Sequence, residues 1–247
     1  MKISVVMVCL NAEKTITFAI ESFLNQSHPD KELIIIDGAS SDRTVEIARS
    51  FHSPGIRIVS ERDHGIYDAM NKGLRLFDGD AIGFIGADDT FSGRNSLTLI
   101  ADALADADIV YGDLDMVRDH TSKRVVRVWK SGEFHPKAFL RGWMPAHATF
   151  YIRRKVVDAV GFFDTTYDIG SDYDFILRAM IRNFRVRYIK EILIDFQLGG
   201  KSSQGLRSAF HQNVECLRAR RRHIGAPPLD LAFFLKWARK VLQFRLG

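Results

Sequence analysis

The stretch that decides the fold reads Ile82-Gly83-Phe84-Ile85-Gly86-Ala87-Asp88-Asp89-Thr90, in which a short apolar run leads directly into two adjacent acids. A run of this length, rich in Ile and Phe and bounded by Gly, is typical of a buried strand. Ligands of open α/β sheets bind at the carboxyl ends of the strands, so we expect Asp88 and Asp89 to face a binding site. Neighbouring carboxylates repel each other unless a cation or hydrogen-bond donors lie between them, and oxygen ligands of this kind suit Mg²⁺ or Mn²⁺. Taken alone, the two acids are equally compatible with a solvated turn or a helix N-cap.

The composition of the 247-residue chain is that of a folded globular protein, with 46% hydrophobic and 26% charged residues. A chain of this length holds one large domain, or one domain with an appendage. It contains no run of about 18 apolar residues, and residues 1–8 are too short and too soon polar for a signal peptide. Cys9 and Cys216 lie far apart and lack metal-ligand spacing, which predicts a reduced, cytoplasmic protein.

Positive charge is concentrated in the last part of the chain. Residues 178–247 contain 15 Lys or Arg and 4 Asp or Glu, a net charge of +11, whereas the whole chain carries +5. A basic region of this kind either faces an anionic partner or forms a solvated surface. On charge alone, phospholipid, nucleic acid and anionic glycolipid are all candidate partners.

The first 60 residues alternate between strand and helix patterns. Apolar runs predict strands at 3–9, 33–36 and 56–60, and helical spacing predicts helices at 14–25 and from Ser41 or Asp42 to about Phe51. This β-α-β-α-β order predicts a parallel sheet with right-handed crossovers. Neither a G-x-G-x-x-G after the first strand nor a G-x-x-x-x-G-K-[ST] occurs, which argues against an ordinary dinucleotide dehydrogenase or a P-loop NTPase. We therefore expect side chains and a metal, rather than a Gly-rich loop, to hold any nucleotide.

A polar segment and a helix, residues 60–73, lead into the strand that carries the acids. Arg62 and Lys72 could face phosphates, and Asp63 could accept a hydrogen bond from a ribose hydroxyl. Each of these side chains could equally belong to a solvated loop and helix. Further along, the pattern predicts a helix at 94–104, a hairpin that pairs 116–117 with 124–128, a strand at 193–196 and a flexible loop at 199–203 that could close over a diphosphate.

Four motifs in this order resemble the family-2 glycosyltransferases, most closely the members that build bacterial polysaccharides. They are Asn11, the stretch Asp37-Gly38-Ala39-Ser40-Ser41-Asp42-Arg43-Thr44, the stretch from Asp63 to Gly73, and Ala87-Asp88-Asp89. The resemblance covers about residues 1–200. It implies an α/β protein of the GT-A fold, with a Rossmann-like, mostly parallel central sheet flanked by helices. Residues 1–205 would form the catalytic domain, with a nucleotide-binding half to about residue 113 and an acceptor half from about 114.

The resemblance also implies roles for particular residues. Asp88 and Asp89 would hold Mg²⁺ or Mn²⁺, and the nucleoside diphosphate sugar would contact Asn11, Asp37, Arg62, Asp63, Lys72 and Asp88. Gly38 replaces the second Asp of the usual Asp-Asp-Gly-Ser, which contacts uracil in uridine-using members, and Leu10 stands where some members place an aromatic residue. The nucleobase is therefore left open among UDP, GDP and dTDP.

Asp172 is the candidate catalytic base. It lies with Ser171 where a helix begins, and the helix dipole at that end stabilises an ionised carboxylate. N-capping by Ser171 or Asp172 is the alternative reading. The resembled family commonly has Glu-Asp here, with the Asp as general base, which carries that role onto Asp172. Ser171 departs from the pattern, and Asp174 is the second candidate.

The predicted function is transfer of a hexosyl or N-acetylhexosaminyl group, with inversion, from a nucleoside diphosphate sugar to a hydroxyl of a saccharide or lipid-linked saccharide in cell-surface polysaccharide synthesis. A sugar-1-phosphate nucleotidyltransferase and a non-catalytic sugar- or nucleotide-binding scaffold are the alternatives. Nucleic acid is not expected as a partner, because the basic region has no recognised reading motif.

The end of the chain, residues 206–247, is predicted to be a basic amphipathic helical tail. After a helix at 206–223 and the break at Pro227-Pro228, residues 229–246 place basic side chains on one face and aromatic and aliphatic ones on the other. This pattern is typical of a helix that lies in a membrane interface, so we expect a peripheral protein on the inner face of the cell membrane. Packing against the catalytic domain or a second subunit is the alternative.

Overall fold

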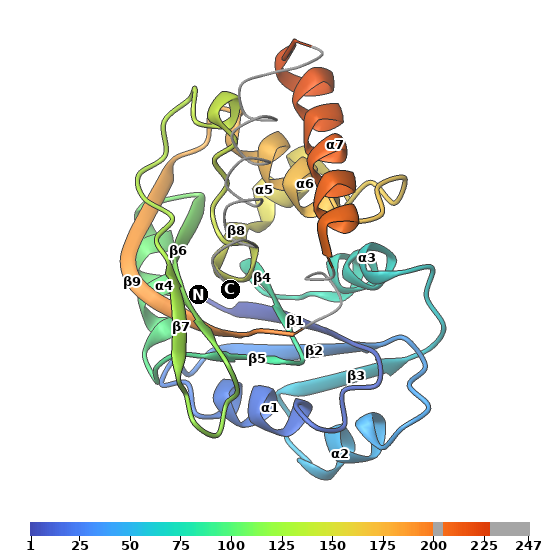
Figure 1. The fold of residues 1–247 in the computed structure, drawn as a ribbon. Coiled ribbons are helices and arrows are strands. Elements are labelled where there is room, and N and C mark those ends of the chain that lie inside the picture. Colours follow the sequence, from blue (N-terminus) through green and yellow to red (C-terminus); the bar gives the residue numbers. More distant parts are fainter. Residues whose placement is uncertain (200–204, 228–247) are drawn as a thin grey trace.

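The structure, a computed structural model, describes residues 1–199 and 205–227. Within these residues a sheet of nine strands runs through the molecule in the order β3-β2-β1-β4-β8-β6-β9-β5, with β7 paired to β6 (Figure 1). Residues 200–204 and 228–247, which include most of the predicted loop at 199–203 and the predicted helix at 229–246, lie outside the described residues.

The first half of the sheet is parallel, as the strand and helix alternation predicts. It contains β1 (Ile3–Cys9), β2 (Lys31–Asp37), β3 (Ile56–Ser60) and β4 (Ala81–Gly86). Residue Val6 of β1 pairs with Ile34 on one side and with Phe84 on the other. The chain moves outward from β1 to β3 and then returns to the opposite side of β1, so the topological switch lies between β1 and β4.

Helices cover both faces of these strands, which explains why the strands are continuous apolar runs. The helices are α1 (Ile16–Leu24), α2 (Thr44–Ser50) and α3 (Ile66–Leu76). Val5 and Met7 share a core with α1, whereas Val6 and Val8 point to the other face and share a core with α3. The alternation of side chains along β1 therefore separates two cores.

Antiparallel pairs enter the sheet in its second half. The chain passes through β5 (Asp89–Phe91), α4 (Ser96–Asp106), β6 (Ile109–Val117), β7 (Val125–Trp129), β8 (Tyr151–Arg153), α5 (Arg154–Val160), α6 (Ser171–Met180) and β9 (Val186–Gln197). The predicted hairpin is confirmed as the antiparallel pair β6 and β7, while β9 is much longer than the predicted strand at 193–196. Strand β8 packs so closely on β4 that the Tyr151 ring fills the space beside Gly83. This contact explains the first Gly of the stretch at 82–90.

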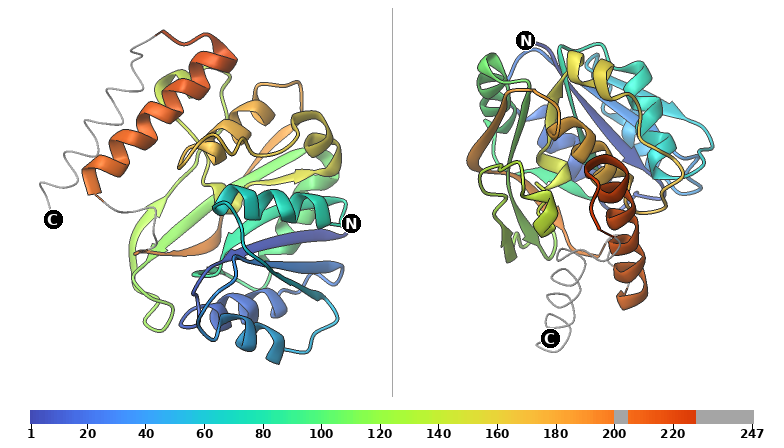
Figure 2. Two further views of the ribbon diagram at one scale, coloured as in Figure 1. Left: turned by 90° about the vertical axis from the view of Figure 1, so that its right-hand side faces the viewer. Right: turned by 90° about the horizontal axis from the view of Figure 1, so that it is seen from above.

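Helix α7 (Gly205–Ile224) packs along α6, and Figure 2 shows the two helices side by side. The side chains of Cys216, Ala219 and Arg220 are buried in this contact. The described part of the predicted tail is therefore packed against the rest of the protein. Within residues 1–199 and 205–227, no helix has both the length and the apolar character that a membrane span requires.

Candidate functional site

The predicted site residues follow the carboxyl ends of the four parallel strands. Asn11 follows β1, Asp37 ends β2, Arg62 and Asp63 follow β3, and the paired acids follow β4. Because parallel strands end at the same edge of a sheet, the topology brings these residues to one edge.

Asp88 and Asp89 lie side by side at the tip of β4. A Cβ atom placed on Gly86 would lie 2.6 Å from Oδ1 of Asp88 and 2.9 Å from Oδ2 of Asp89, so both carboxylates flank this glycine. Asp89 is buried, and its Oδ1 accepts a hydrogen bond of 3.1 Å from the backbone N–H of Gln197. The two acids thus share one small space at the end of the strand.

The electrostatics of this pair suit a cation. Burial raises the pKa of Asp89 well above its usual 3.8, and repulsion from Asp88 raises it further. Burial also raises the pKa of Asp88, against the opposing effects of its own backbone N–H and of His120. Two crowded oxygen ligands whose ionisation is disfavoured fit Mg²⁺ or Mn²⁺, because a divalent ion would neutralise both charges.

His120 holds the loop of the two acids and was not identified from the sequence. Its Nε2 lies 2.7 Å from the backbone oxygen of Asp88, and its Nδ1 lies 3.4 Å from the hydroxyl oxygen of Thr90. The ring is buried, and His120 belongs to the turn that joins β6 to β7, which has no recognisable motif. Only the pairing of distant strands brings it to the acids.

Asn11 and Asp37 shape the loop between β2 and α2. The Asp37 carboxylate is fully buried and accepts hydrogen bonds from the Ser40 N–H at 3.0 Å and the Ser60 hydroxyl at 2.7 Å. Asn11, at φ 54°, accepts a hydrogen bond of 2.9 Å from the Ser41 N–H through its Oδ1. The exposed Asn11 and the buried Asp37 therefore both fix the loop at the predicted nucleotide-binding edge.

Asp63 lies directly against Gly38. A Cβ atom on Gly38 would be 2.5 Å from Oδ2 of Asp63, while Oδ1 of Asp63 accepts a hydrogen bond of 3.0 Å from the N–H of Gly65. The Asp63 carboxylate thus occupies the space that a side chain at position 38 would need. The resembled family has an acid at the position of Gly38, just after β2. In this chain the neighbouring acid is instead Asp63, on the loop between β3 and α3.

The two predicted phosphate-binding cations differ in their surroundings. Lys72 donates a hydrogen bond of 2.8 Å to the backbone oxygen of Arg62 and forms an ion pair of 3.0 Å with Glu61. Its ammonium group therefore ties α3 to the preceding loop. The side chain of Arg62 is exposed on that loop.

Asp172 lies in the first turn of α6 and faces the first turn of α3. The Tyr67 hydroxyl donates to the backbone oxygen of Ile169 and lies 3.5 Å from Oδ1 of Asp172. That Oδ1 also accepts a hydrogen bond of 2.7 Å from the N–H of Tyr173. The first turn of α3 follows the carboxyl end of β3, at the edge that carries the predicted nucleotide residues. Because Asp172 lies beside Tyr67 in that turn, it is close to this edge although it belongs to the second half of the chain.

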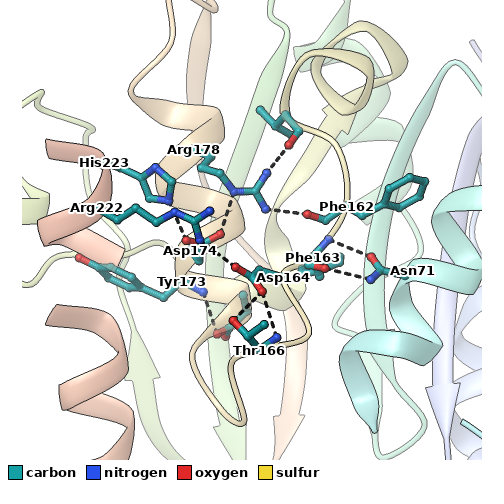
Figure 3. A network of polar contacts seen from close by, with 12 residues as sticks. Asn71, Phe162, Phe163, Asp164, Thr166, Tyr173, Asp174, Arg178, Arg222 and His223 are labelled. Atoms are coloured by element: carbon teal, nitrogen blue, oxygen red, sulfur yellow. Dashed lines mark hydrogen bonds and ion pairs between the residues drawn. The ribbon is translucent and has the colours of Figure 1, made fainter. Parts of the chain in front are cut away.

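Asp174, the second candidate base, is buried and paired with side chains of α6 and α7. It is 1% exposed and accepts a hydrogen bond of 2.7 Å from Arg178 Nε, while Nε2 of His223 lies 2.8 Å from its other oxygen (Figure 3). Both oxygens are thus engaged at the contact of α6 with α7. This arrangement leaves Asp172 as the candidate that faces α3.

Two residues of the segment before β8 pack inside the protein. The His147 ring stacks on Phe84 with centroids 5.7 Å apart, and burial lowers its pKa below 6.5, although the charge of Asp172 opposes this shift. Trp143, which is half-buried, donates a hydrogen bond of 2.6 Å to the backbone oxygen of Ser131 and packs among aromatic rings.

Comparison with known proteins gives a family. The model of "Glycosyl transferase family 2" matches residues 4–161, more than half of the chain. A PGL/p-HBAD biosynthesis glycosyltransferase of Mycobacterium bovis is 29% identical over 208 residues, which is 81% of this chain and 78% of that protein. The amylovoran biosynthesis glycosyltransferase AmsB of Erwinia amylovora is 28% identical over 208 residues, 79% of this chain and 69% of that protein.

Solved structures share the fold. TarS 1–349 of S. aureus in complex with UDP-GlcNAc has a TM-score of 0.71 at 19% identity, over 97% of this chain and 71% of that one. The mannosyltransferase PcManGT from Pyrobaculum calidifontis, in complex with GDP-Man and Mn²⁺, has a TM-score of 0.69 at 17% identity, over 96% of this chain and 69% of that one. The α/β fold predicted from the motifs is confirmed by this likeness.

Proposed function

Since the chain belongs to glycosyl transferase family 2, we propose that it moves one hexosyl or N-acetylhexosaminyl group from a nucleoside diphosphate sugar to a hydroxyl of a saccharide acceptor, with inversion. The observation that carries this proposal is the crowded pair at the tip of β4, in which Asp89 is buried and Asp88 is half-buried. Two crowded acids at the end of a strand would be placed to bind a divalent cation beside the diphosphate of a donor.

Asp88 and Asp89 would hold a divalent metal, which would neutralise the charge that develops on the departing diphosphate. His120 keeps the loop of the two acids in place through the backbone oxygen of Asp88. The Mn²⁺ in the complex of the mannosyltransferase of similar fold supports this assignment.

Asp172 would act as the general base. The acceptor oxygen bonds to the anomeric carbon, the bond from that carbon to the diphosphate oxygen breaks, and Asp172 takes the proton of the attacking hydroxyl. Attack from the face opposite the leaving group inverts the anomeric centre. The Tyr67 hydroxyl, 3.5 Å from Asp172 Oδ1, borders the carboxylate on the α3 side.

The nucleotide would lie along the ends of β1, β2 and β3. Asn11 and Asp37 would shape its site, Asp63 and Arg62 would contact it directly, and Lys72 would hold the loop of these two residues. Solved structures of the same fold hold UDP-GlcNAc and GDP-Man, so UDP, GDP and dTDP sugars are the donors to test.

The acceptor we propose is a lipid-linked saccharide, used in cell-surface polysaccharide synthesis at an anionic membrane surface. Relatives that take part in PGL/p-HBAD and amylovoran biosynthesis support this class of product. A hollow of about 500 Å³ on α7 is lined by Val214, Leu217, Arg218, Arg221 and Arg222, a mixture of apolar and cationic side chains that suits anionic lipid.

The test is a panel of UDP, GDP and dTDP sugars with Mn²⁺ and the full-length protein, scored by release of the nucleoside diphosphate. We expect one donor class to be turned over, and Asp172→Asn to lower turnover by about 10²–10⁴-fold while diphosphate binding is kept. Full activity of Asp172→Asn would show that the base is wrongly assigned. Formation of a nucleotide sugar from a sugar 1-phosphate and a nucleoside triphosphate would instead identify a nucleotidyltransferase.

A further inference from the structure

We propose that Glu215, on α7, is a positioning residue for Asp172. This inference rests on the proposed role of Asp172 as the base, and it makes α7 part of the catalytic unit. The sequence suggests only a basic tail at this point, and neither the family match at residues 4–161 nor the predicted motifs include Glu215.

Glu215 holds the turn that immediately precedes α6. Its Oε1 accepts a hydrogen bond of 2.9 Å from the N–H of Asp168, and its Oε2 accepts hydrogen bonds of 2.9 Å and 2.7 Å from the N–H groups of Ile169 and Gly170. Three consecutive backbone donors therefore converge on one buried carboxylate. Hydrogen bonds to an ionised acceptor are stronger than those between neutral groups, so this contact fixes the turn.

The turn needs a close approach of α7, and the sequence provides for it. A Cβ atom on Gly170 would lie 2.9 Å from the Cβ of Glu215, so any larger residue at position 170 would push α7 away. The absence of a side chain at Gly170 is what allows the Glu215 carboxylate to reach all three N–H groups.

The turn passes this constraint on to Asp172. The backbone oxygen of Ile169, inside the turn, accepts the hydrogen bond of the Tyr67 hydroxyl, and that hydroxyl also borders Asp172. Asp172 follows the turn by two residues. If the turn is released, both the backbone that carries Asp172 and the contact with Tyr67 lose their fixed geometry.

A metal site is the competing explanation for these residues, because ligand atoms of Asp168, His211 and Glu215 lie within 4.8 Å of one another. The oxygens of Glu215 already accept the three backbone hydrogen bonds, and Nε2 of His211 lies 3.2 Å from the exposed Asp168 carboxylate. The geometry points to a carboxylate that binds the turn.

Other contacts hold α7 on the protein without Glu215. His223 lies 2.8 Å from the buried Asp174, and Arg222 donates a hydrogen bond of 2.9 Å to Asp164 (Figure 3). These two contacts lie about two turns beyond Glu215, at the C-terminal end of α7. A substitution at residue 215 can therefore release the turn while α7 stays docked.

The experiment compares Glu215→Gln, Glu215→Ala and Asp172→Asn in the full-length protein with Mn²⁺ and the donor that the wild type turns over fastest. Glu215→Ala should lower kcat for nucleoside diphosphate release by about 10- to 100-fold, because small displacements of a catalytic group have effects of this size. The KM for the donor and the Kd for the free nucleoside diphosphate should stay within about two-fold. Glu215→Gln keeps one acceptor oxygen and should fall between the wild type and Glu215→Ala.

His223→Ala is the matched control, because it weakens the same contact between α6 and α7 at its other end. It should lower the thermal stability and leave kcat of the folded protein unchanged. The inference is overturned if Glu215→Gln keeps the wild-type kcat, and this comparison holds even if Glu215→Ala does not fold. It is also overturned if His223→Ala loses as much kcat as Glu215→Ala. Full activity of Asp172→Asn would overturn the assignment of the base, on which this inference rests, whereas a wild type without donor turnover would contradict the proposed function itself.

Discussion

Gly38 has no side chain, and this leaves room for the carboxylate of Asp63 beside it. Because a Cβ atom there would lie 2.5 Å from the Asp63 carboxylate, the two positions cannot both carry side chains in their present arrangement. Position 38 is thus linked to an acid from a different loop. An acid at either position would accept hydrogen bonds from N–H groups of a nucleobase or hydroxyls of a ribose.

We predict that Gly38→Ala displaces Asp63 and weakens binding of the nucleoside diphosphate. Overpacking of this kind costs about 1–3 kcal/mol, so a moderate loss of thermal stability should accompany the loss of affinity. Calorimetric titration with UDP and GDP in the presence of Mn²⁺ measures the first effect. Gly93→Ala is the control, since a Cβ atom there meets nothing within 4 Å. If the two variants bind the nucleoside diphosphate with equal affinity, Asp63 does not contact the nucleotide.

Asp89 gives a prediction for pH. Its raised pKa means that the folded, metal-free protein holds this proton more tightly than the unfolded chain, whose carboxyl titrates near 3.8. The stability contributed by the protonated carboxyl is therefore complete below that value and is lost as the pH rises through the folded pKa. Asp89→Asn should remove this loss and should also abolish stabilisation by Mn²⁺.

Denaturant titrations over a pH series, with EDTA or with Mn²⁺, measure both effects. The exposed Asp158→Asn is the control and should behave like the wild type. If Mn²⁺ stabilises Asp89→Asn as much as the wild type, the metal binds elsewhere.

At the scale of elements, α3 joins the two halves of the chain. Asn71, buried in α3, donates a hydrogen bond of 3.0 Å to the backbone oxygen of Phe163 and accepts one of 2.8 Å from its N–H (Figure 3). Tyr67, one turn earlier, reaches the segment before α6. The helix that lies beside the predicted nucleotide loop therefore also places the loops of the predicted acceptor half.

Asn71→Ala should destabilise the protein strongly, because it leaves two buried backbone groups without partners, and each such group costs about 1–3 kcal/mol. Chemical denaturation of the metal-free protein measures the change in the free energy of unfolding. The exposed Asn183→Ala should change it little. A small effect of Asn71→Ala would mean that the Phe163 segment finds other partners or water.

At the scale of the whole molecule, α7 is a part of the basic region that packs against α6, in the second half of the chain. Arg220 on α7 is fully buried, and the aromatic ring of Tyr173 lies 5.7 Å from its guanidinium carbon. Removal of α7 would expose the apolar side chains of α6 that share a core with Cys216 and Ala219, so we expect α7 to be necessary for the stability of the domain.

We predict that a chain ending at residue 204 unfolds at a markedly lower temperature than the full chain and binds a hydrophobic dye. A chain ending at residue 227 should keep the melting temperature and donor turnover, and should bind vesicles of anionic phospholipid more weakly than the full chain. Thermal unfolding and vesicle sedimentation measure these outcomes. Stable folding of the chain that ends at 204 would contradict the role of α7, and unchanged vesicle binding by the chain that ends at 227 would contradict the membrane proposal.

Local patterns in the sequence predicted the alternation of strands and helices in the first 60 residues, the parallel arrangement of β1 to β3, and the family. These features depend on local apolar patterns and on motifs whose spacing can be read along the chain. It also identified the stretch that ends in Asp88 and Asp89, because the change from apolar to acidic residues lies within nine neighbouring positions. The edge on which these acids lie follows from the strand order alone.

The tertiary structure alone decided which distant side chains support that edge. His120 beside Asp88, Asp63 against Gly38, and Glu215 on the turn before Asp172 join segments that are 25 to 47 residues apart in the chain. No periodic pattern records such contacts, because each depends on how closely two packed elements approach. Likewise Asp174, only two residues from Asp172, is turned toward α7 because a helix places neighbouring residues on different faces.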